Sequence, residues 1–422
     1  MPFEVDPGMH AEEELQGAGI MIVGVGGCGG NAVNGMIERN IEGVRYVVFN
    51  TDQQALRHSK AINRVKIGRE TTGGLGAGAD PAVGRKAAEE DRDAITEQLK
   101  GADLVFITAG MGKGTGTGAA PVIAAIARSM GILTIGVVTR PFGFEGRISA
   151  AIADEGISEL RKHIDTLILV ENEKIAASAE ERASTTEVYN MVNEILYQAA
   201  KSISDIITFH GHVNVDFADV RSIMAGGGDA LMGSAAAAGQ RKALRAATAA
   251  LESPLLDGVC LNDAKGLLVN ISGKVEMQDL QDAMRFIGEQ VGNKAKIING
   301  YVDQQLRENE ARVTIIVTGF THQPHKAPEE PKTPLIIPPK AAEGRAPAED
   351  LATPAYVRRN IPIEGPFATP QANAPEQNTT TSRYTPFFGS ADDNIRKEGS
   401  IIPAFRRRTD NPNFTGLFPA DN

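Results

Sequence analysis

One glycine-rich loop organises this chain, and it reads Gly110-Met111-Gly112-Lys113-Gly114-Thr115-Gly116-Thr117-Gly118. The loop follows an apolar, strand-like run at residues 104–108 and leads into an alanine-rich, helix-like run at residues 119–128. Because glycine has no Cβ, the backbone N–H groups of such a loop can contact a polyanion, and the positive end of the following helix faces the same ligand. A flexible linker is the alternative, but a linker does not need a buried strand and a helix on either side. The loop therefore predicts a cradle for a di- or triphosphate.

The composition limits the class of protein. The chain has 422 residues, of which 42% are hydrophobic, and a formal net charge of −10. Its length suits two or three domains, and its negative charge argues against binding to nucleic acid. Only two cysteines occur, Cys28 and Cys260, so the chain has no disulfide framework and we expect a reducing cytoplasm. The N-terminus lacks the regions of a signal peptide, and no apolar run of about 18 residues occurs, so we expect no direct membrane insertion.

Strand-like apolar runs alternate with helix-like runs from residue 20 to residue 171. Such alternation is typical of a parallel sheet that is covered on both faces, so we predict an α/β, Rossmann-like domain over residues 19–185. Glycine-rich loops follow three of the strands, at residues 24–31, 72–81 and 110–118. Since ligands of these sheets bind at the carboxyl ends of the strands, we expect the three loops to converge on one site.

The rest of the chain divides into further regions. Apolar residues recur at periods of three and four over residues 186–211, which predicts one long central helix between two domains. Strand-like runs outnumber helix-like runs over residues 212–320, so we predict a second domain of the α+β class there. Many prolines follow, and we expect a disordered linker at residues 321–399, then a docking peptide and tail at residues 400–422. The acidic, polar residues 1–18 predict a disordered N-terminal tail.

A second glycine pattern offers an alternative function. Gly24-Val25-Gly26-Gly27-Cys28-Gly29 fits the dinucleotide pattern G-x-G-x-x-G, and Asp52 ends the next strand. This pattern alone is weak, because an NAD-type oxidoreductase has no evident need for a second glycine loop at residues 110–118. A P-loop is excluded, since Lys113 is followed by Gly114 rather than by serine or threonine. We therefore expect nucleotide phosphates to be held by a system that matches neither standard motif.

A polar cluster follows the long helix and comprises Asn214, Asp216 and Asp219. One interpretation is structural, with Asp216 as the N-cap of a helix that begins at Phe217. The other is functional, with two carboxylates on one helical face that orient a water for attack on a γ-phosphate. The glycine loops precede the long helix and this cluster follows it. Both groups can meet at one nucleotide only through a bend within the chain or through a second copy of the chain.

Several segments together resemble one known family. Residues 110–118 resemble the glycine-rich signature of the tubulin family, and residues 214–220 resemble the synergy loop of its FtsZ branch, the bacterial cell-division GTPases. Further segments match the same family, at residues 27–31, 50–52, 74–81, 141–146 and 253–256. The resemblance runs from about residue 18 to residue 320. It resumes near residue 400, where Ile401-Ile402-Pro403-Ala404-Phe405-Arg406-Arg407-Arg408 resembles the family's C-terminal docking peptide.

The resemblance implies a GTPase that polymerises head to tail into filaments of a division ring in the cytoplasm. GTP or GDP would bind the first domain, with Mg²⁺ neutralising the phosphates and no metal site built from protein ligands alone. Asn214, Asp216 and Asp219 of one subunit would complete the active site of the next. The peptide at residues 401–408 would bind membrane-anchoring and regulatory division proteins.

The resemblance also assigns the residues that would contact the nucleotide. They lie in the glycine loops, in the segment after the fifth strand, at the end of the sixth strand and on the long helix. These residues are Gly27, Cys28, Gly29, Gly30, Asn31, Gly78, Gly112, Lys113, Gly114, Thr115, Gly116, Thr117, Glu145, Ser149, Asn172, Asn190 and Glu194.

Two of these positions depart from the family pattern at the phosphates. Lys113 stands where the family has glycine, and Ser149 stands where an arginine is expected. Loss of a charge-assisted contact costs about 1.5–3 kcal/mol, and we hypothesise that Lys113 partly replaces it. Cys28 stands in a glycine position, and we interpret it as a tolerated small residue rather than a redox group.

Two further departures concern the base. Asn190 stands where an aromatic side chain usually stacks on guanine, and Glu194 stands where an aspartate usually pairs with the guanine edge. Looser base selectivity is therefore predicted. The departures also leave an alternative function open, a divergent paralogue that binds nucleotide and co-assembles or regulates with weak hydrolysis.

Overall fold

The computed structural model describes residues 17–179, 182–208, 215–257, 261–292, 295–303 and 309–320. Nearly all of the predicted N-terminal tail therefore lies outside the described residues. So do the predicted linker at residues 321–399 and the docking peptide at residues 400–422. Asn214 and Cys260 also lie outside them.

Six parallel strands form the first half of the sheet, in the order β3-β2-β1-β4-β5-β6. They are β1 (Ile20–Val25), β2 (Val44–Asn50), β3 (Asn63–Lys66), β4 (Leu104–Gly110), β5 (Leu133–Arg140) and β6 (Thr166–Glu171). All six residues of β1 are buried, as the continuous apolar run predicts for a strand covered on both faces. The predicted parallel α/β arrangement is confirmed.

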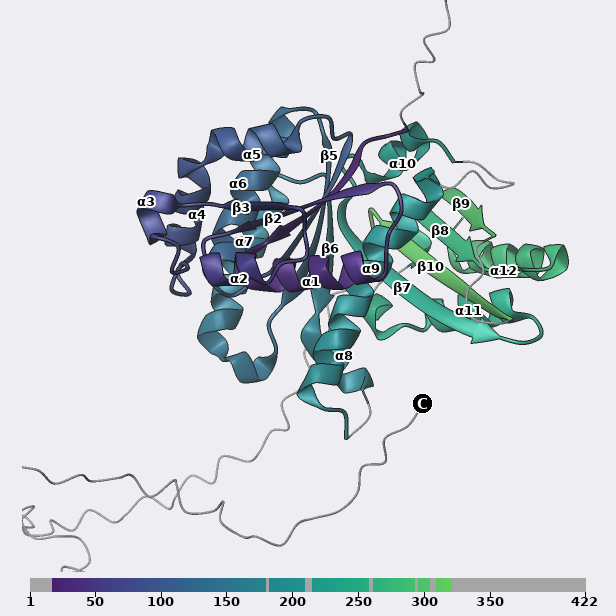
Figure 1. Ribbon diagram of the computed structural model, residues 1–422. Helices are drawn as coiled ribbons and strands as arrows, with labels where there is room; N and C mark the ends of the chain where they lie inside the picture. Colours follow the sequence, from purple (N-terminus) through teal and green to yellow (C-terminus); the bar gives the residue numbers. More distant parts are fainter. Residues whose placement is uncertain are drawn as a thin grey trace, which may run out of the picture. The chain divides into compact units, whose positions relative to one another are not determined.

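Helices cover both faces of these strands (Figure 1). They are α1 (Gly26–Glu38), α2 (Gln53–Arg57), α3 (Arg69–Thr72), α4 (Pro81–Glu90), α5 (Arg92–Leu99), α6 (Thr115–Ser129), α7 (Arg147–Arg161) and α8 (Asn172–Ser178), with a short 3₁₀ helix, η1 (Gly143–Glu145). One buried cluster joins the sheet to α4, α5, α6 and α7, and another joins the opposite face to α1 and α9 (Thr185–Thr208). Successive residues of β1 point into different clusters, because side chains alternate along a strand.

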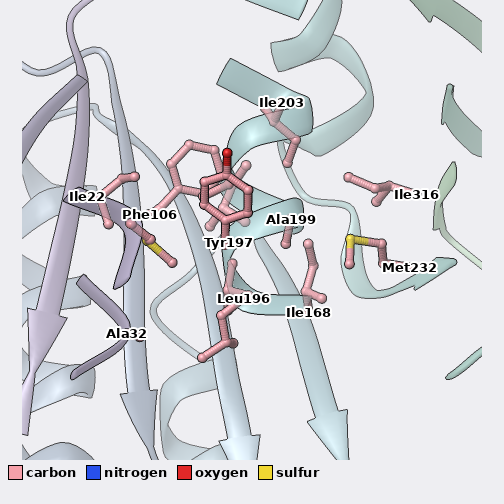
Figure 2. Packing of buried hydrophobic residues seen from close by; sticks show 14 of the residues in the cluster. Ile22, Ala32, Phe106, Ile168, Leu196, Tyr197, Ala199, Ile203, Met232 and Ile316 are labelled. Atoms are coloured by element: carbon pink, nitrogen blue, oxygen red, sulfur yellow. The ribbon is translucent and has the colours of Figure 1, made fainter. Parts of the chain in front are cut away.

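The long central helix is present as α9 and shares one core with both halves of the protein. Leu196, Ala199 and Ile203 of α9 belong to the same buried cluster as Phe106 of β4 and Ile316 of β10 (Glu310–Thr318). Figure 2 shows these α9 side chains among apolar residues of the strands on either side of the helix. The helix therefore connects the two halves through a continuous apolar core.

The second half adds four strands to the same sheet, in the order β7-β10-β8-β9. They are β7 (Gly228–Ala238), β8 (Gly266–Ser272), β9 (Lys296–Val302) and β10. The β7–β10 and β10–β8 pairs are antiparallel, whereas β8 and β9 are parallel. β7 also pairs with β6 over Thr166 to Ile168, so the sheet continues between the two halves. Helices α11 (Lys242–Leu251) and α12 (Met277–Gln290) pack on these strands, and α10 (Phe217–Met224) precedes them.

Candidate functional site

The predicted cradle is held in shape by the hydroxyl of Thr117. Its Oγ1 accepts hydrogen bonds from the backbone nitrogens of Gly112 and Lys113, at 3.0 and 3.1 Å. Helix α6 begins at Thr115, and its N-cap residue, Gly114, has no side chain that could cap it. The first N–H groups of a helix have no partner within the helix, so this end is suited to an anion. Thr117 therefore holds the loop against the start of α6, whose first N–H groups have no side-chain cap.

Glycine is required at two points of this loop by the neighbouring backbone. Gly112 has φ +103°, and a Cβ there would lie 2.8 Å from the carbonyl oxygen of Ser149. A Cβ on Gly118 would lie 2.0 Å from the carbonyl oxygen of Pro81, at the start of α4. Both distances are shorter than real contacts allow, so the loop packs directly on the segments around it.

The first glycine loop adjoins the cradle. Helix α1 begins at Gly26 without a side-chain cap, and a Cβ on Gly26 would lie 3.0 Å from the nitrogen of Gly116. Since β1 and β4 are parallel neighbours, both helix starts stand at the same carboxyl edge of the sheet. Within this loop the predicted residues Gly27, Cys28 and Asn31 are exposed, whereas Gly29 and Gly30 are buried.

Two more predicted contacts border the cradle. Gly78 is exposed in the loop before α4 and has φ +57°. In the same loop, Ala77 is close enough to Gly114 that a Cβ on Gly114 would lie 2.7 Å from the Ala77 Cβ. Thr115 lies next to Thr51, with 2.6 Å between their hydroxyl oxygens. The three glycine-rich loops therefore converge at one edge of the sheet.

Cys28 is exposed as a residue, but its thiol lies against protein atoms of the cradle. Its Sγ is 3.8 Å from the hydroxyl oxygen of Thr139 at the end of β5. Desolvation by the surrounding protein raises the pKa of this thiol above its ordinary value, against a smaller opposing effect of the Thr139 contact. A thiol held in its protonated form is a poor nucleophile, which agrees with a packing role for Cys28.

Lys113 supplies a positive charge at the mouth of the cradle. Its Nζ lies 3.4 Å from Oε2 of Glu145, and the other carboxylate oxygen of Glu145 accepts from the backbone nitrogen of Phe142 at 3.2 Å. Ser149 donates its hydroxyl to the carbonyl oxygen of Glu145, at 3.0 Å, so its side chain is engaged locally. The Lys113 side chain is 72% exposed, which leaves its ammonium free to move toward a ligand.

The residues predicted to contact the base occupy the start of α8 and the first turns of α9. Asn172 is buried, and its Oδ1 has no hydrogen-bond partner among the described residues. Asn190 is exposed. The residue before it, Tyr189, is 40% exposed and packs edge-on against Phe142, with ring centroids 5.1 Å apart. Tyr189 was not predicted as a site residue, although an aromatic one position from Asn190 was a visible signal.

Glu194 is already engaged by positively charged groups. Its carboxylate pairs with Arg39, the C-cap residue of α1, lies 3.7 Å from Arg312 of β10, and accepts a hydrogen bond from Gln198 at 2.7 Å. A guanine edge that approached Glu194 would have to compete with these partners.

The carboxylates after the long helix lie on α10. Asp216 is the N-cap of this helix and accepts a hydrogen bond from the backbone nitrogen of Asp219, at 2.8 Å. The capping interpretation is therefore confirmed, and it occupies one of the two carboxylate oxygens of Asp216. Both aspartates are exposed.

Helix α10 stands at the opposite edge of the sheet from the cradle. Its Arg221 donates to the carbonyl oxygen of Gly131, just before β5, and Thr166 at the start of β6 donates to the carbonyl oxygen of Met224. The cradle follows the carboxyl ends of the strands, so the length of a strand such as β5, about 26 Å, separates the two groups. Figure 1 shows α8 and α10 at opposite ends of α9. Within one subunit, the structure does not bring Asp216 and Asp219 to the cradle.

The described residues contain no group of three or more His, Cys, Asp or Glu side chains suited to hold a metal ion. No helix among them is both long and apolar enough to cross a membrane.

Two family models match the chain. Residues 19–180 match the GTPase domain of the Tubulin/FtsZ family, and residues 228–321 match the C-terminal domain of the FtsZ family. Over 303 residues the chain is 48% identical to the cell division protein FtsZ of Caulobacter vibrioides, in each of two strains. The match covers 71% of this chain and spans 60% of the length of those relatives.

The chain is also similar in structure to solved proteins. An empty FtsZ dimer from M. jannaschii is similar with a TM-score of 0.69 and 37% sequence identity, covering 72% of this chain and 88% of that one. A GDP-bound monomer of CetZ1 from Haloferax volcanii is similar with a TM-score of 0.62 and 24% identity, covering 72% and 96%. At that identity the second likeness supports the fold alone.

Proposed function

Because the chain belongs to the tubulin/FtsZ family, in its FtsZ branch, we propose that it binds and hydrolyses GTP and polymerises head to tail into filaments of the cell-division ring. Its active site is shared between adjacent subunits. Its place is the cytoplasm at the division site, and its other partners are membrane-anchoring and regulatory division proteins that bind residues 401–408.

One observation carries this proposal: the cradle and the α10 carboxylates stand at opposite edges of one sheet. A site that needs both groups is therefore completed by a second copy, whose α10 edge faces the cradle. Such a head-to-tail contact is heterologous, and it extends into a filament when its rotation does not close a ring. The alternative of a bend within the chain conflicts with the rigid core that α9 shares with both halves.

Exposed apolar side chains near the cradle support the same contact. Leu75, Phe144 and Ile148 are 91, 74 and 79% exposed, and each belongs to a segment that borders the cradle. At the other edge, Ile297 follows the first residue of β9 and is 37% exposed. Large apolar side chains left in water near a polar site are typical of an interaction surface.

The mechanism assigns separate roles to the two edges. The N–H groups at the start of α6 bind the phosphates, while the Thr117 hydroxyl keeps the N–H groups of Gly112 and Lys113 in place. The Lys113 ammonium shifts from Glu145 toward the phosphate oxygens. Asp219 of the neighbouring subunit orients the attacking water and accepts its proton, while Asp216 keeps α10 in register through its cap. Hydrolysis is therefore slow until two subunits meet.

A Mg²⁺ ion in this site would be held mainly by the phosphates and water, because Mg²⁺ in nucleotide sites usually takes only one or two protein carboxylates. When bound, it neutralises phosphate charge. At the base, Tyr189 offers a partly exposed ring near Asn190, whereas the unpartnered Oδ1 of Asn172 is buried. Because Glu194 is paired with Arg39, we propose that base selectivity is looser than a free carboxylate would give.

Mixing two inactive variants tests the shared site. Gly27→Asp, at an exposed position where a Cβ meets nothing within 4 Å, places a negative charge beside the cradle, and Asp219→Ala removes the neighbour's carboxylate. Each variant alone should release almost no phosphate. An equimolar mixture should recover up to about a quarter of the wild-type rate, because random head-to-tail contacts then pair an intact cradle with an intact carboxylate. Activity in the mixture that equals the sum of the two variants contradicts the proposal. GTP binding without turnover by the wild type would favour the paralogue with weak hydrolysis.

A further inference from the structure

Asp219 has a positively charged partner that comes from a distant part of the chain. The Nζ of Lys296, the first residue of β9, lies 3.7 Å from Oδ1 of Asp219 and donates to the hydroxyl of Ser222 at 2.7 Å. Ser222 in turn donates to the carbonyl oxygen of Asp219 at 2.6 Å. The ammonium is therefore held against α10 by two groups on adjacent turns of that helix.

The sheet fixes the position from which Lys296 reaches α10. The backbone nitrogen of Lys296 donates to the carbonyl oxygen of Lys265 at 2.9 Å, and Lys296 is paired in register with Gly266 of β8. Lys296 therefore stands at the same edge of the sheet as α10. Its side chain is 55% exposed and that of Asp219 is 51% exposed, so the pair faces the surrounding solvent rather than the core.

The negative charge of the α10 edge opposes its approach to a nucleotide, and the Lys296–Asp219 ion pair reduces that charge. Two exposed carboxylates, Asp216 and Asp219, must approach a triphosphate, and like charges repel most strongly where water is excluded. Among the described residues, Lys296 is the cation that forms an ion pair with either aspartate. Arg221, a cation on α10 itself, donates to the carbonyl oxygen of Gly131 instead.

We propose that Lys296 is a positioning residue for the shared active site: it holds the Asp219 carboxylate on α10 and offsets its charge as this edge meets a neighbour's GTP. This inference rests on the proposed function. Lys296 contacts neither the phosphates nor the water, and it acts through Asp219. Since the ion pair is exposed, its effect depends on ionic strength.

Three variants test the inference. Lys296→Ala removes the ammonium, and Lys296→Arg retains a charge that can pair with a carboxylate. Lys265→Ala removes an exposed lysine that directly precedes the neighbouring strand β8. Among the described residues the Lys265 side chain makes no ion pair, so this variant is matched for charge and location. The readouts are GTP affinity, the amount of polymer that sediments, and phosphate release per assembled subunit at about 50 mM and about 300 mM salt.

Lys296→Ala is expected to lower phosphate release per assembled subunit about two- to fivefold at the lower salt, the range for an exposed ion pair, with GTP affinity unchanged. The defect should shrink at the higher salt, because screening weakens the repulsion that Lys296 offsets. Lys296→Arg should retain most of the wild-type rate, and Lys265→Ala should match the wild type. The inference is overturned if Lys296→Ala behaves like Lys265→Ala, or if its defect is the same at both salt concentrations.

Asp219→Ala, measured in parallel, separates this inference from the function on which it rests. If Asp219→Ala keeps full turnover, the shared site itself is wrong. If Asp219→Ala abolishes turnover while Lys296→Ala leaves it intact, the proposed function stands and the role of Lys296 is wrong.

Discussion

The cradle and the α10 edge are built in opposite ways. The cradle consists of backbone groups, packed so closely that a single Cβ at Gly112 or Gly118 has no room, and held by the buried hydroxyl of Thr117. The α10 edge consists of exposed side chains, each held by one or two surface contacts. In our account, affinity for the nucleotide is built into the core, whereas the groups that attack it stay in water until a neighbour covers them.

This difference predicts two kinds of mutational effect. A change in the cradle should disturb packing and nucleotide affinity together, because the same atoms serve both. A change on the α10 edge should leave folding and affinity intact and lower turnover alone. A cradle variant with unchanged GTP affinity, or an α10 variant with weakened GTP binding, would contradict this difference between the two sites.

The largest effect is expected at Asp219. Asp219→Ala should lower phosphate release by about 10²–10⁴-fold, the usual contribution of a positioned general base, while GTP affinity stays within error of the wild type. Asp93→Ala, an exposed aspartate on α5, is the matched control and should be silent. Phosphate release and equilibrium GTP binding measure the two quantities separately. A parallel loss of GTP affinity in Asp219→Ala would place this carboxylate at its own cradle, against the account.

A smaller effect, on GTP affinity rather than on turnover, is expected at Gly112. Gly112→Ala forces a side chain to φ +103° and toward the Ser149 carbonyl, and a left-handed residue costs about 1–2 kcal/mol before any clash. GTP affinity should therefore fall by about tenfold or more. Gly35→Ala in α1 has open space at its Cβ and should keep affinity and slightly raise the melting temperature. Equal affinities for the two variants would show that the loop is less constrained than its packing indicates.

A still smaller change is expected at Lys113. Lys113→Gly removes the cation at the mouth of the cradle, and because that cation is exposed we expect GTP affinity to fall only a few-fold, with a smaller loss at high salt. Lys60→Gly, which removes another exposed, ion-paired lysine, serves as the control. Competition binding against GDP measures the change. Unchanged affinity would mean that Lys113 does not replace the arginine expected at position 149.

The smallest effect concerns Cys28, whose pKa is raised mainly by desolvation. A thiol with a raised pKa stays protonated up to a higher pH. Alkylation by iodoacetamide should therefore be slower than in the urea-unfolded chain at every pH below its folded pKa. Its stabilising effect on the fold is present below the unfolded pKa and is lost as the pH rises through the folded pKa. The Cys260→Ser substitution leaves Cys28 as the only thiol that can be alkylated, and bound GTP should slow its alkylation further. Faster alkylation of the folded protein would indicate a reactive thiolate.

The sequence predicted the first half of the molecule well, because buried parallel strands and glycine loops have strong local signals. Asn50-Thr51-Asp52 and residues 110–118 do lie at the same edge of the sheet. The pairing of β6 with β7 could not be predicted, because an apolar run indicates a strand but does not indicate which strand lies beside it. The ion pair between Arg39 and Glu194 joins residues 155 positions apart, and a contact over such a separation has no local pattern in the sequence.

The α10 edge shows more clearly what the sequence alone could not predict. Spacing alone left Asp216 open between a cap and a catalytic group, and the capping bond to Asp219 confirms the first without removing the second. Lys296 reaches Asp219 from a strand 77 positions further along the chain, so no motif contained it. Tyr189 packs edge-on against Phe142, and this contact between segments far apart in the chain could not be predicted from the sequence.

The most direct test of the shared site is a concentration series of GTP turnover. Phosphate release per subunit is measured at saturating GTP while the protein concentration is varied across the threshold at which polymer first sediments. We predict that turnover per subunit is near zero below this threshold and rises steeply above it, because the α10 edge of a neighbour then covers each cradle. Turnover per subunit that is constant, and equally fast in dilute, unassembled protein, would contradict the central claim that each active site needs two molecules.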